Sequence, residues 1–516
     1  MAFYRRLKKF FKEVLVEKLQ KNVKISETYP IMIIHLYCIS TVTSSPREVI
    51  KIAGSSKQAL GEFSKVFKKI SILTSKWNYT LHKAIQLASS IIREPKTHNF
   101  FQRLSYSVNM GVDLESFMKI EYEKMLETSS AEFDRAIEKT KRYIEAYSAL
   151  LTATSFLSVS MLLISIIYGM NSEKLLTYST ILISGTLASI VFLMARTLPR
   201  DPVIHREKPR PLALFTIEKT IKILTVSSLT ASIILMITLK SSGNQLLGEY
   251  SPTFIPLVMA GLPLLAVSWI GRKYVKNVEK MDENYPSFIK SLGDALSATN
   301  SLKQASKILE VNDYGSINKL LRNLRRRVEL GFEYNKALNM FGVESLSQLI
   351  LKTVRIIADS VFYGARVEVY SKTVYDYVIR QLLDRKKRRQ VAGSLKGLVI
   401  PLQATMIAVS ALITVLAKIM YRFTILIREW FPIFSILPPT QVQTYFYILI
   451  LIVALLSSAA IYFVEGDSAF TYTYFLGLLL SMSGLIYMAV SMASDTLFQM
   501  FLKFEEGMED IVGGIR

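Results

Sequence analysis

The stretch TYFYILILIVALLSSAAIYFV, Thr444 to Val464, contains no charged residue. A helix needs about 20 mostly apolar residues to cross the hydrocarbon core of a bilayer, and this stretch has that length. Backbone polar groups in lipid must be satisfied within the segment, so a helix is the expected structure. The stretch therefore predicts a membrane-spanning helix, and the fold depends on how many similar stretches the chain contains.

The composition agrees with a membrane protein. The chain has 516 residues, 51% of them hydrophobic, a mean hydropathy of +0.30 and a formal net charge of +22. Six further stretches approach the length of a membrane span. They are Ala146 to Met170, Leu175 to Ala195, Ile221 to Leu239, Thr253 to Gly271, Leu395 to Met420 and Phe470 to Ala493. We therefore expect an all-α polytopic membrane protein with about seven transmembrane helices.

The distribution of basic residues predicts the orientation. The loop from Arg196 to Lys219 is rich in Lys and Arg, whereas the loop from Lys240 to Pro252 is not. Because basic loops stay in the cytoplasm, the first loop is predicted inside and the second outside the plasma membrane. The predicted regions are a cytoplasmic helical domain with a cytoplasmic N-terminus (1–145), four spans (146–271), a second cytoplasmic helical domain (272–394), and three spans with a short tail (395–516).

The excess of basic residues is better accounted for by the membrane than by nucleic acid. The positive charge accompanies long apolar runs, so we expect contact with membrane lipids and no nucleic acid as partner. The opening segment, Met1 to Asn22, is basic and amphipathic and does not resemble a signal peptide. The single cysteine, Cys38, excludes an internal disulfide framework.

The two predicted cytoplasmic regions echo each other. Tyr29-Pro30 matches Tyr285-Pro286 at an offset of 256 residues. Further along, the stretch from Leu104 to Asp113 matches the stretch from Leu324 to Glu333 at an offset of 220, which places 36 extra residues in the region of Gly54 to Lys96 of the first copy. The spacing indicates a helical stripe in each copy. We interpret the regions as two copies of one helical unit.

Each copy has a glycine at the end of a predicted helix. Gly111 and Gly331 are expected to be structural turns, because a left-handed backbone costs little without a Cβ. After each glycine we expect a long helical stretch that runs into a membrane span, in the second copy from Leu346 onward.

Motifs for catalysis are not found. Gly54-Ser55-Ser56-Lys57 lacks the length and ending of a phosphate-binding loop, so the chain is not expected to hydrolyse ATP or to be an enzyme. The histidines are scattered without a metal-binding spacing, so neither a metal nor a cofactor is expected. They are His35, His82, His98 and His205.

The two units resemble a known family: the integral platform proteins of type IV pili, type II secretion and the archaeal flagellum (archaellum). The resemblance rests on YPIMIIHLYCIS with RLSYSVNMGVDLESF, and on YPSFIKSLGDALSATNSLKQASKIL with LRRRVELGFEYNKAL, each followed by a charged helix and a span. It covers nearly the whole chain. Two copies with four spans between them look like the archaeal branch.

The resemblance implies a function. Such a platform lies at the base of a filament, docks a hexameric secretion ATPase on its cytoplasmic bundles, and couples ATP-driven motion to the insertion of pilin or archaellin subunits into the filament. The sequence leaves open which filament is served and whether the chain forms a homodimer.

Two basic clusters are candidate partner-binding sites. A docking surface for an acidic face of the ATPase would use charge to steer approach. A solvated helix end, contact with lipid headgroups and topology bias are the alternatives to docking. The clusters are Arg325, Arg326 and Arg327, and Arg385, Lys386, Lys387, Arg388 and Arg389.

Two further classes of protein stay open. A secondary transporter also contains internal repeats, but those repeats lie in the membrane spans rather than in soluble regions. A membrane signalling receptor with cytoplasmic output domains is the second alternative. Binding of a motor ATPase by the region 272–394 would separate these cases.

Overall fold

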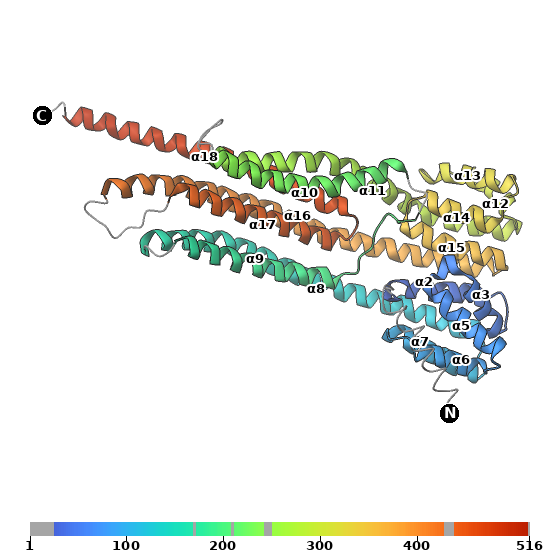
Figure 1. Ribbon diagram of the computed structural model, residues 1–516. Helices are drawn as coiled ribbons and strands as arrows, with labels where there is room; N and C mark the ends of the chain where they lie inside the picture. Colours follow the sequence, from blue (N-terminus) through green and yellow to red (C-terminus); the bar gives the residue numbers. More distant parts are fainter. Residues whose placement is uncertain (1–24, 169–171, 208–210, 242–249, 428–437, 514–516) are drawn as a thin grey trace. The chain divides into compact units, whose positions relative to one another are not determined.

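The computed structural model describes residues 25–168, 172–207, 211–241, 250–427 and 438–513 (Figure 1). These residues form helices, and the one isolated β-bridge among them joins Ile204 to Ser347. The prediction of an all-α protein is confirmed. The amphipathic segment predicted at the N-terminus lies outside the described residues.

The chain divides into two compact units. Unit 1 consists of Met1–Asp134, Val203–Arg210 and Lys276–Arg385, and unit 2 of Arg135–Pro202, Pro211–Val275 and Lys386–Arg516. Unit 1 thus draws on both regions that the sequence analysis assigned to the cytoplasm.

Short helices build unit 1 and long apolar helices build unit 2. Unit 1 contains α2 (Ile25–Ser40), α3 (Pro46–Ser55), α4 (Lys57–Leu60), α5 (Glu62–Lys76), α6 (Leu81–Ser89), α7 (Pro95–Asn109), α12 (Leu302–Leu309), α13 (Ile317–Glu329), α14 (Tyr334–Glu344) and α15 (Gln348–Tyr363). Unit 2 contains α9 (Ser172–Thr197), α10 (Leu212–Ser241), α17 (Pro439–Glu465) and α18 (Ala469–Gly513). Three helices have residues in both units: α8 (Leu114–Tyr168), α11 (Ser251–Thr299) and α16 (Val367–Ile427).

The chain is a multi-pass membrane protein. Among the described residues, 6 helices are long and apolar enough to cross a bilayer. They lie within α9, α10, α11, α16, α17 and α18 and contain six of the seven predicted spans. The remaining predicted span, Ala146 to Met170, falls in α8, and its last two residues lie outside the described part of the chain.

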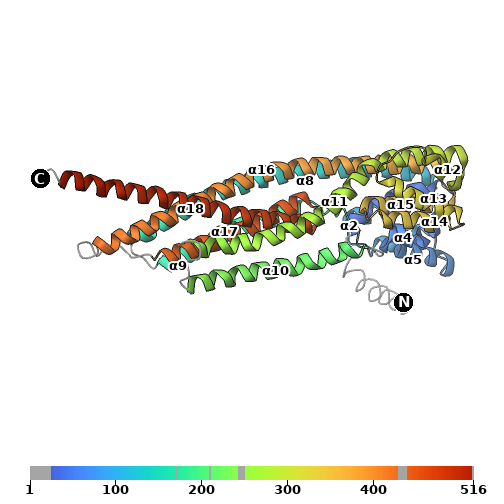
Figure 2. The same cartoon turned by 90° about the horizontal axis from the view of Figure 1, so that it is seen from above.

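Small residues allow the helices of unit 2 to approach closely. A Cβ placed on Gly261 of α11 would lie 2.5 Å from the backbone nitrogen of Ser481 in α18, which no real side chain tolerates. Gly477 of α18 meets the backbone of α11 in the same way. Helix α17 packs against both α9 and α18, and both views show it beside α18 (Figures 1 and 2). Such close packing is the main source of helix association in lipid, where burial of apolar groups supplies little.

Unit 1 contains the same order of helices twice. Helices α2, α3, α5, α6, α7 and the start of α8 form repeat 1 (residues 25–134), and the end of α11, α12, α13, α14, α15 and the start of α16 form repeat 2 (residues 276–385). Equivalent residues of the two repeats differ in number by 256 in α2 and α3 and by 253 in α6, α7 and the start of α8. Pro46 of α3 is thus equivalent to Leu302 of α12, and Pro95 of α7 to Gln348 of α15. The buried positions of α7 follow this offset: Thr97, Phe100, Phe101, Leu104 and Ser107 match Ile350, Thr353, Val354, Ile357 and Ser360 of α15.

This order corrects the offset of 220 inferred from the sequence. Gly111 ends α7 and is equivalent to Gly364, which ends α15, and not to Gly331, which ends α13. The region of Gly54 to Lys96 is therefore no 36-residue insertion, because its helices α5 and α6 have counterparts in repeat 2, α13 and α14. Likewise, the long helix expected from Leu346 onward is interrupted between the end of α15 at Tyr363 and the start of α16 at Val367. The error arose because any amphipathic helix with a glycine C-cap shows the same short pattern.

Helix α2 joins the two repeats. Every residue from Ile31 to Ser40 is buried, and α2 packs against α15 of repeat 2. The resulting core is continuous across both repeats. Because burial of one Ile or Leu side chain contributes about 1.5–3 kcal/mol, α2 supplies a large part of the stability of unit 1.

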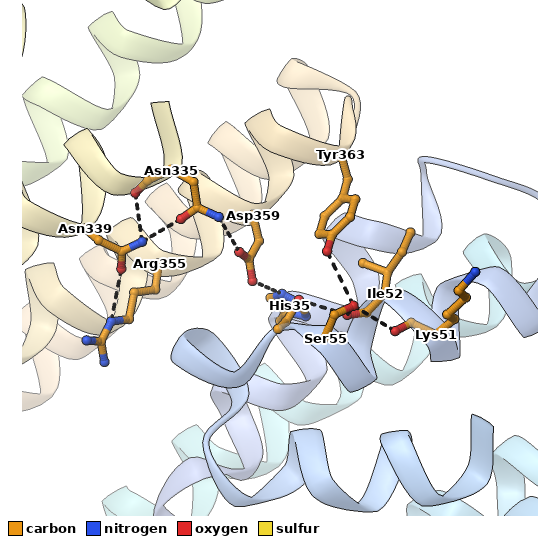
Figure 3. A network of polar contacts seen from close by, with 10 residues as sticks. His35, Lys51, Ile52, Ser55, Asn335, Asn339, Arg355, Asp359 and Tyr363 are labelled. Carbon is orange, nitrogen blue, oxygen red and sulfur yellow. Dashed lines mark hydrogen bonds and ion pairs between the residues drawn. The ribbon is translucent and has the colours of Figure 1, made fainter. Parts of the chain in front are cut away.

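A polar pair lies inside this apolar interface. His35 of α2 is fully buried, and its Nε2 lies 3.0 Å from Oδ2 of Asp359 in α15 (Figure 3). Asn335 of α14 donates to the second carboxylate oxygen of Asp359 at 3.4 Å. At the edge of the interface, the hydroxyl of Tyr363 lies 3.5 Å from that of Ser55. Buried polar groups are costly when unpaired, so the pair fixes the register of the two repeats.

Replacing His35 by leucine is expected to destabilise the contact between α2 and α15 by about 3 kcal/mol, because the carboxylate of Asp359 stays buried without its partner. Hydrogen exchange of the α2 and α15 amides in the full chain measures this loss. The double variant H35L/D359L should lose less than the sum of the single variants. Tyr106→Ala, at the exposed position equivalent to Asp359, is the control and should change protection little. Unchanged protection in H35L would contradict the structural role of the pair.

The connection between α9 and α10 is anchored on repeat 2. The amide of His205 donates to the carbonyl of Leu346 at 3.0 Å, and the amide of Gln348 donates to the carbonyl of Val203 at 2.9 Å. Arg355 of α15 donates to Glu207 through both terminal nitrogens, with Nη1 2.8 Å from Oε1. This hydrogen bonding holds the pKa of the Glu207 carboxyl below its usual value.

The anchored connection is expected to loosen in acid. Because the pKa of Glu207 is depressed in the folded chain, its contribution is complete above the unfolded value of about 4.3 and is lost as the pH falls through the folded pKa. Glu207 is half exposed, so the loss should stay below about 1 kcal/mol. Hydrogen exchange of the amides from Val203 to Glu207, corrected for the intrinsic rate, should show less protection at pH 3 than at pH 6. In Arg355→Met this pH dependence should disappear; a wild-type chain equally protected at both pH values would refute the assignment.

Candidate functional site

The first basic cluster is only partly available to a partner. Arg325 binds Glu310 and Glu329, and its Nε lies 2.9 Å from Oε1 of Glu329. The hydrogen bond to Glu329, which has the largest effect, and the one to Glu310 raise the pKa of Arg325. Arg327 pairs with Glu344 of α14. Two of the three predicted arginines therefore stabilise repeat 2 itself.

The exposed cations of α13 form a different set. Arg326 is exposed, and so are Lys319 and Arg322, which precede it on the same helix. Steps of three and four residues place the three side chains on one face. None of them has an ion pair with the described part of the chain. We call this set the α13 basic stripe. Three consecutive arginines are conspicuous in the sequence, but they do not identify the exposed face of α13. The signal that identifies it is the helical spacing of Lys319, Arg322 and Arg326.

The second basic cluster mixes buried and exposed residues. Arg385 is buried, and its Nη1 donates to Oδ2 of Asp282 at 2.7 Å within unit 1. Lys386 and Arg389 are exposed, and Lys387 is half-buried. Arg385 therefore has a structural role that sequence reasoning missed.

Arg388 lies in unit 2 and binds the ends of two segments of that unit. Its guanidinium donates to the carbonyls of Val464 at 2.8 Å, Phe463 at 3.0 Å and Pro199 at 2.6 Å. The last carbonyls of a helix such as α17 have no donors within the helix, and a cation is favourable at a helix C-terminus. Arg388 thus stabilises the end of α17 and is not available to a partner.

The turn between α17 and α18 is a buried charged cluster in unit 2. The two spans are joined by this short turn, with Gly466 in the left-handed conformation at φ 69°. Lys396 lies 2.7 Å from Glu465, and Arg272 lies 3.5 Å from it. Burial, followed by the charge of Glu465, raises the pKa of Asp467 to about 6.

The two predicted structural glycines end helices in the same way. Gly111 and Gly331 have φ of +71° and +82°. The amide of Val112 donates to the carbonyl of Ser107 at 3.1 Å, and the amide of Phe332 donates to that of Arg327 at 3.0 Å. Both are Schellman turns, in which the residue after the glycine usually packs against its own helix. Here both following residues are largely exposed, at 46% for Val112 and 44% for Phe332.

The side chains of three of the four histidines, His35, His98 and His205, have structural contacts. Besides the pair of His35 with Asp359, Nδ1 of His98 lies 2.8 Å from the carbonyl of Ser89, and Nε2 of His205 lies 2.9 Å from that of Val343. Among the described residues, no group of three or more His, Cys, Asp or Glu side chains could hold a metal ion. Cys38 is fully buried, and burial raises the pKa of its thiol to about 12.

Comparisons with known proteins identify relatives in archaea. Flagella accessory protein J of Methanocaldococcus jannaschii is 25% identical over 387 residues, which cover 73% of this chain and 68% of the relative. Flagella accessory protein J of Methanococcus voltae is 22% identical over 341 residues, which cover 65% of this chain and 60% of the relative.

Two further comparisons found nothing: no family model matches the chain, and no solved structure matches it. The resemblance deduced from the two helical units nevertheless agrees with both archaeal relatives. The chain is thus similar to archaeal flagella accessory J proteins over most of its length.

Proposed function

We propose that the chain is the membrane assembly platform of an archaeal type IV pilus-like filament, either an archaellum or an adhesive pilus. Unit 1 docks a hexameric secretion ATPase in the cytoplasm, and unit 2 spans the plasma membrane beside the pilin or archaellin subunits. The relationship to the flagella accessory J proteins over most of the chain is the observation that carries this proposal.

The structure supports the cytoplasmic position of unit 1. The basic connection between α9 and α10 is predicted to be inside, and its residues 203–207 bond to repeat 2. Because this connection and repeat 2 belong to one compact unit, they lie on one side of the membrane. The N-terminal repeat belongs to the same unit and is therefore cytoplasmic too.

The α13 basic stripe is the proposed contact for an acidic face of the ATPase. Of the arginines predicted from the sequence, only Arg326 belongs to this stripe, and Lys319 and Arg322 are its other members. Arg325 and Arg327 are left out because they pair with glutamates of repeat 2, and Arg385 and Arg388 because they are buried. Exposed charges of this kind mainly increase the rate of association and fix the register, and salt screens them.

Deletion of the gene tests the whole proposal. Electron microscopy of the source cells should show that one filament type disappears and returns when the chain is restored. The identity of that filament decides between archaellum and pilus. An unaltered set of filaments would refute the platform function and favour the transporter or the receptor.

Charge reversal tests the stripe. Arg322→Glu with Arg326→Glu should raise the Kd of the full chain, in lipid nanodiscs, for the purified ATPase by about tenfold at low salt, which corresponds to about 1.4 kcal/mol. The salt dependence of binding should also decrease. Lys51→Glu with Lys57→Glu changes the net charge equally on exposed positions of repeat 1 and is the control. Equal binding by both double variants would remove the stripe from the docking surface.

A further inference from the structure

The two repeats of unit 1 do not pack symmetrically. If a two-fold axis related them, Tyr106 of repeat 1 would be buried like its equivalent in repeat 2, Asp359. Instead Tyr106 is 67% exposed, whereas Asp359 is 7% exposed. The repeats therefore pack head to tail: the α15–α16 face of repeat 2 covers α2 of repeat 1, and the equivalent α7–α8 face of repeat 1 stays open. Contacts of this heterologous kind always leave one unused surface at each end.

The contacts made by the α15–α16 face of repeat 2 are well defined. Asp359 binds His35, and Tyr363 meets Ser55. Arg366 binds Thr41 through its amide at 3.1 Å, and its side chain pairs with Glu115. The carbonyl of Thr373 accepts from the hydroxyl of Tyr122 at 3.1 Å.

The equivalent face of repeat 1 is apolar and exposed. Subtracting 253 converts the contact residues Asp359, Tyr363 and Thr373 into Tyr106, Met110 and Ile120, and Arg366 into the exposed Asp113. Val112 lies next to Asp113, at the position of Ala365. Tyr106, Met110, Val112 and Ile120 are 67%, 77%, 46% and 63% exposed, and we call these four residues the open apolar face. Three large apolar side chains at equivalent contact positions, with Val112 near them, are more than the scattered exposure normal for a protein surface.

A second copy of this chain does not fit the open apolar face. By analogy with the contact between the repeats, the receiving surface would be an α2-like helix. Helix α2 itself is already covered within its own chain, and the equivalent residues of α11 are polar and exposed. In that segment Ser287, Lys290 and Asp294 occupy the positions of Ile31, Ile34 and Cys38.

We propose that the open apolar face docks an apolar helix of the secretion ATPase, in the way that repeat 2 docks helix α2. The inference rests on the proposed function, which supplies the partner. It assigns the apolar part of the contact to repeat 1, whereas the α13 basic stripe supplies charge from repeat 2. An apolar anchor with a separate charged contact is the usual division between affinity and steering.

Site-specific crosslinking identifies what covers this face. Photoreactive benzoylphenylalanine in place of Tyr106 or Met110, in the full chain and in the source cells, should crosslink to the ATPase. The same group in place of Asp294, at the polar equivalent of Cys38, should not. Crosslinks from Tyr106 or Met110 to a second copy, to residues elsewhere in the same chain, or to nothing would overturn the inference.

Substitution tests the contribution to binding. Tyr106→Lys with Met110→Lys should raise the Kd for the ATPase at least tenfold at both low and high salt, because an apolar contact is not screened. Val311→Lys, at a position that is 86% exposed in repeat 2, should bind as the wild type does. Equal thermal unfolding of all variants excludes a folding defect.

The outcomes separate the two proposals. A wild-type chain that does not bind the ATPase refutes the proposed function and this inference with it. A wild-type chain that binds, and a Tyr106/Met110 double variant that binds equally well, refutes the open apolar face alone.

Discussion

The burial of helix α2 on all sides is the constraint on which unit 1 depends. A helix that is apolar all round must be covered all round, and the six-helix arrangement of one repeat covers only part of it. The remaining surface is covered by α15 of repeat 2. Within this interface His35 and Asp359 are buried polar groups that contact each other, and separating them would be costly, so the register of the two repeats is fixed as well as their association.

Long-period features of the sequence predicted the membrane fold well. A span needs about 20 apolar residues, and that signal is strong enough to place the spans of α9, α10, α11, α16, α17 and α18. Short patterns were less reliable. The match of Leu104–Asp113 with Leu324–Glu333 paired α7 with α13 because both helices end in Schellman turns, although α7 corresponds to α15. Only the full order of helices and their buried positions distinguishes the two alignments.

The candidate site was harder to predict because a cluster of arginines in the sequence does not show where each side chain points. At 100° per residue, three consecutive arginines diverge, and Arg325 and Arg327 meet carboxylates of their own repeat. Arg385 and Arg388, three residues apart, are buried against Asp282 and against helix-terminal carbonyls. Their partners lie far away in the sequence, so local spacing could not reveal them.

Duplication followed by head-to-tail packing explains why the two repeats differ where they do. At one end the surface equivalent to α2 is polar, with Ser287, Lys290 and Asp294 facing solvent, and needs no cover. At the opposite end Tyr106, Met110 and Ile120 are exposed although their equivalents in repeat 2 serve an interface. Water solvates the polar side chains at the first end, which accounts for their exposure. It does not account for the exposure of the large apolar side chains at the second end, because contact with water is unfavourable for apolar groups. The asymmetry between the ends therefore favours a surface kept for a partner over one left by chance.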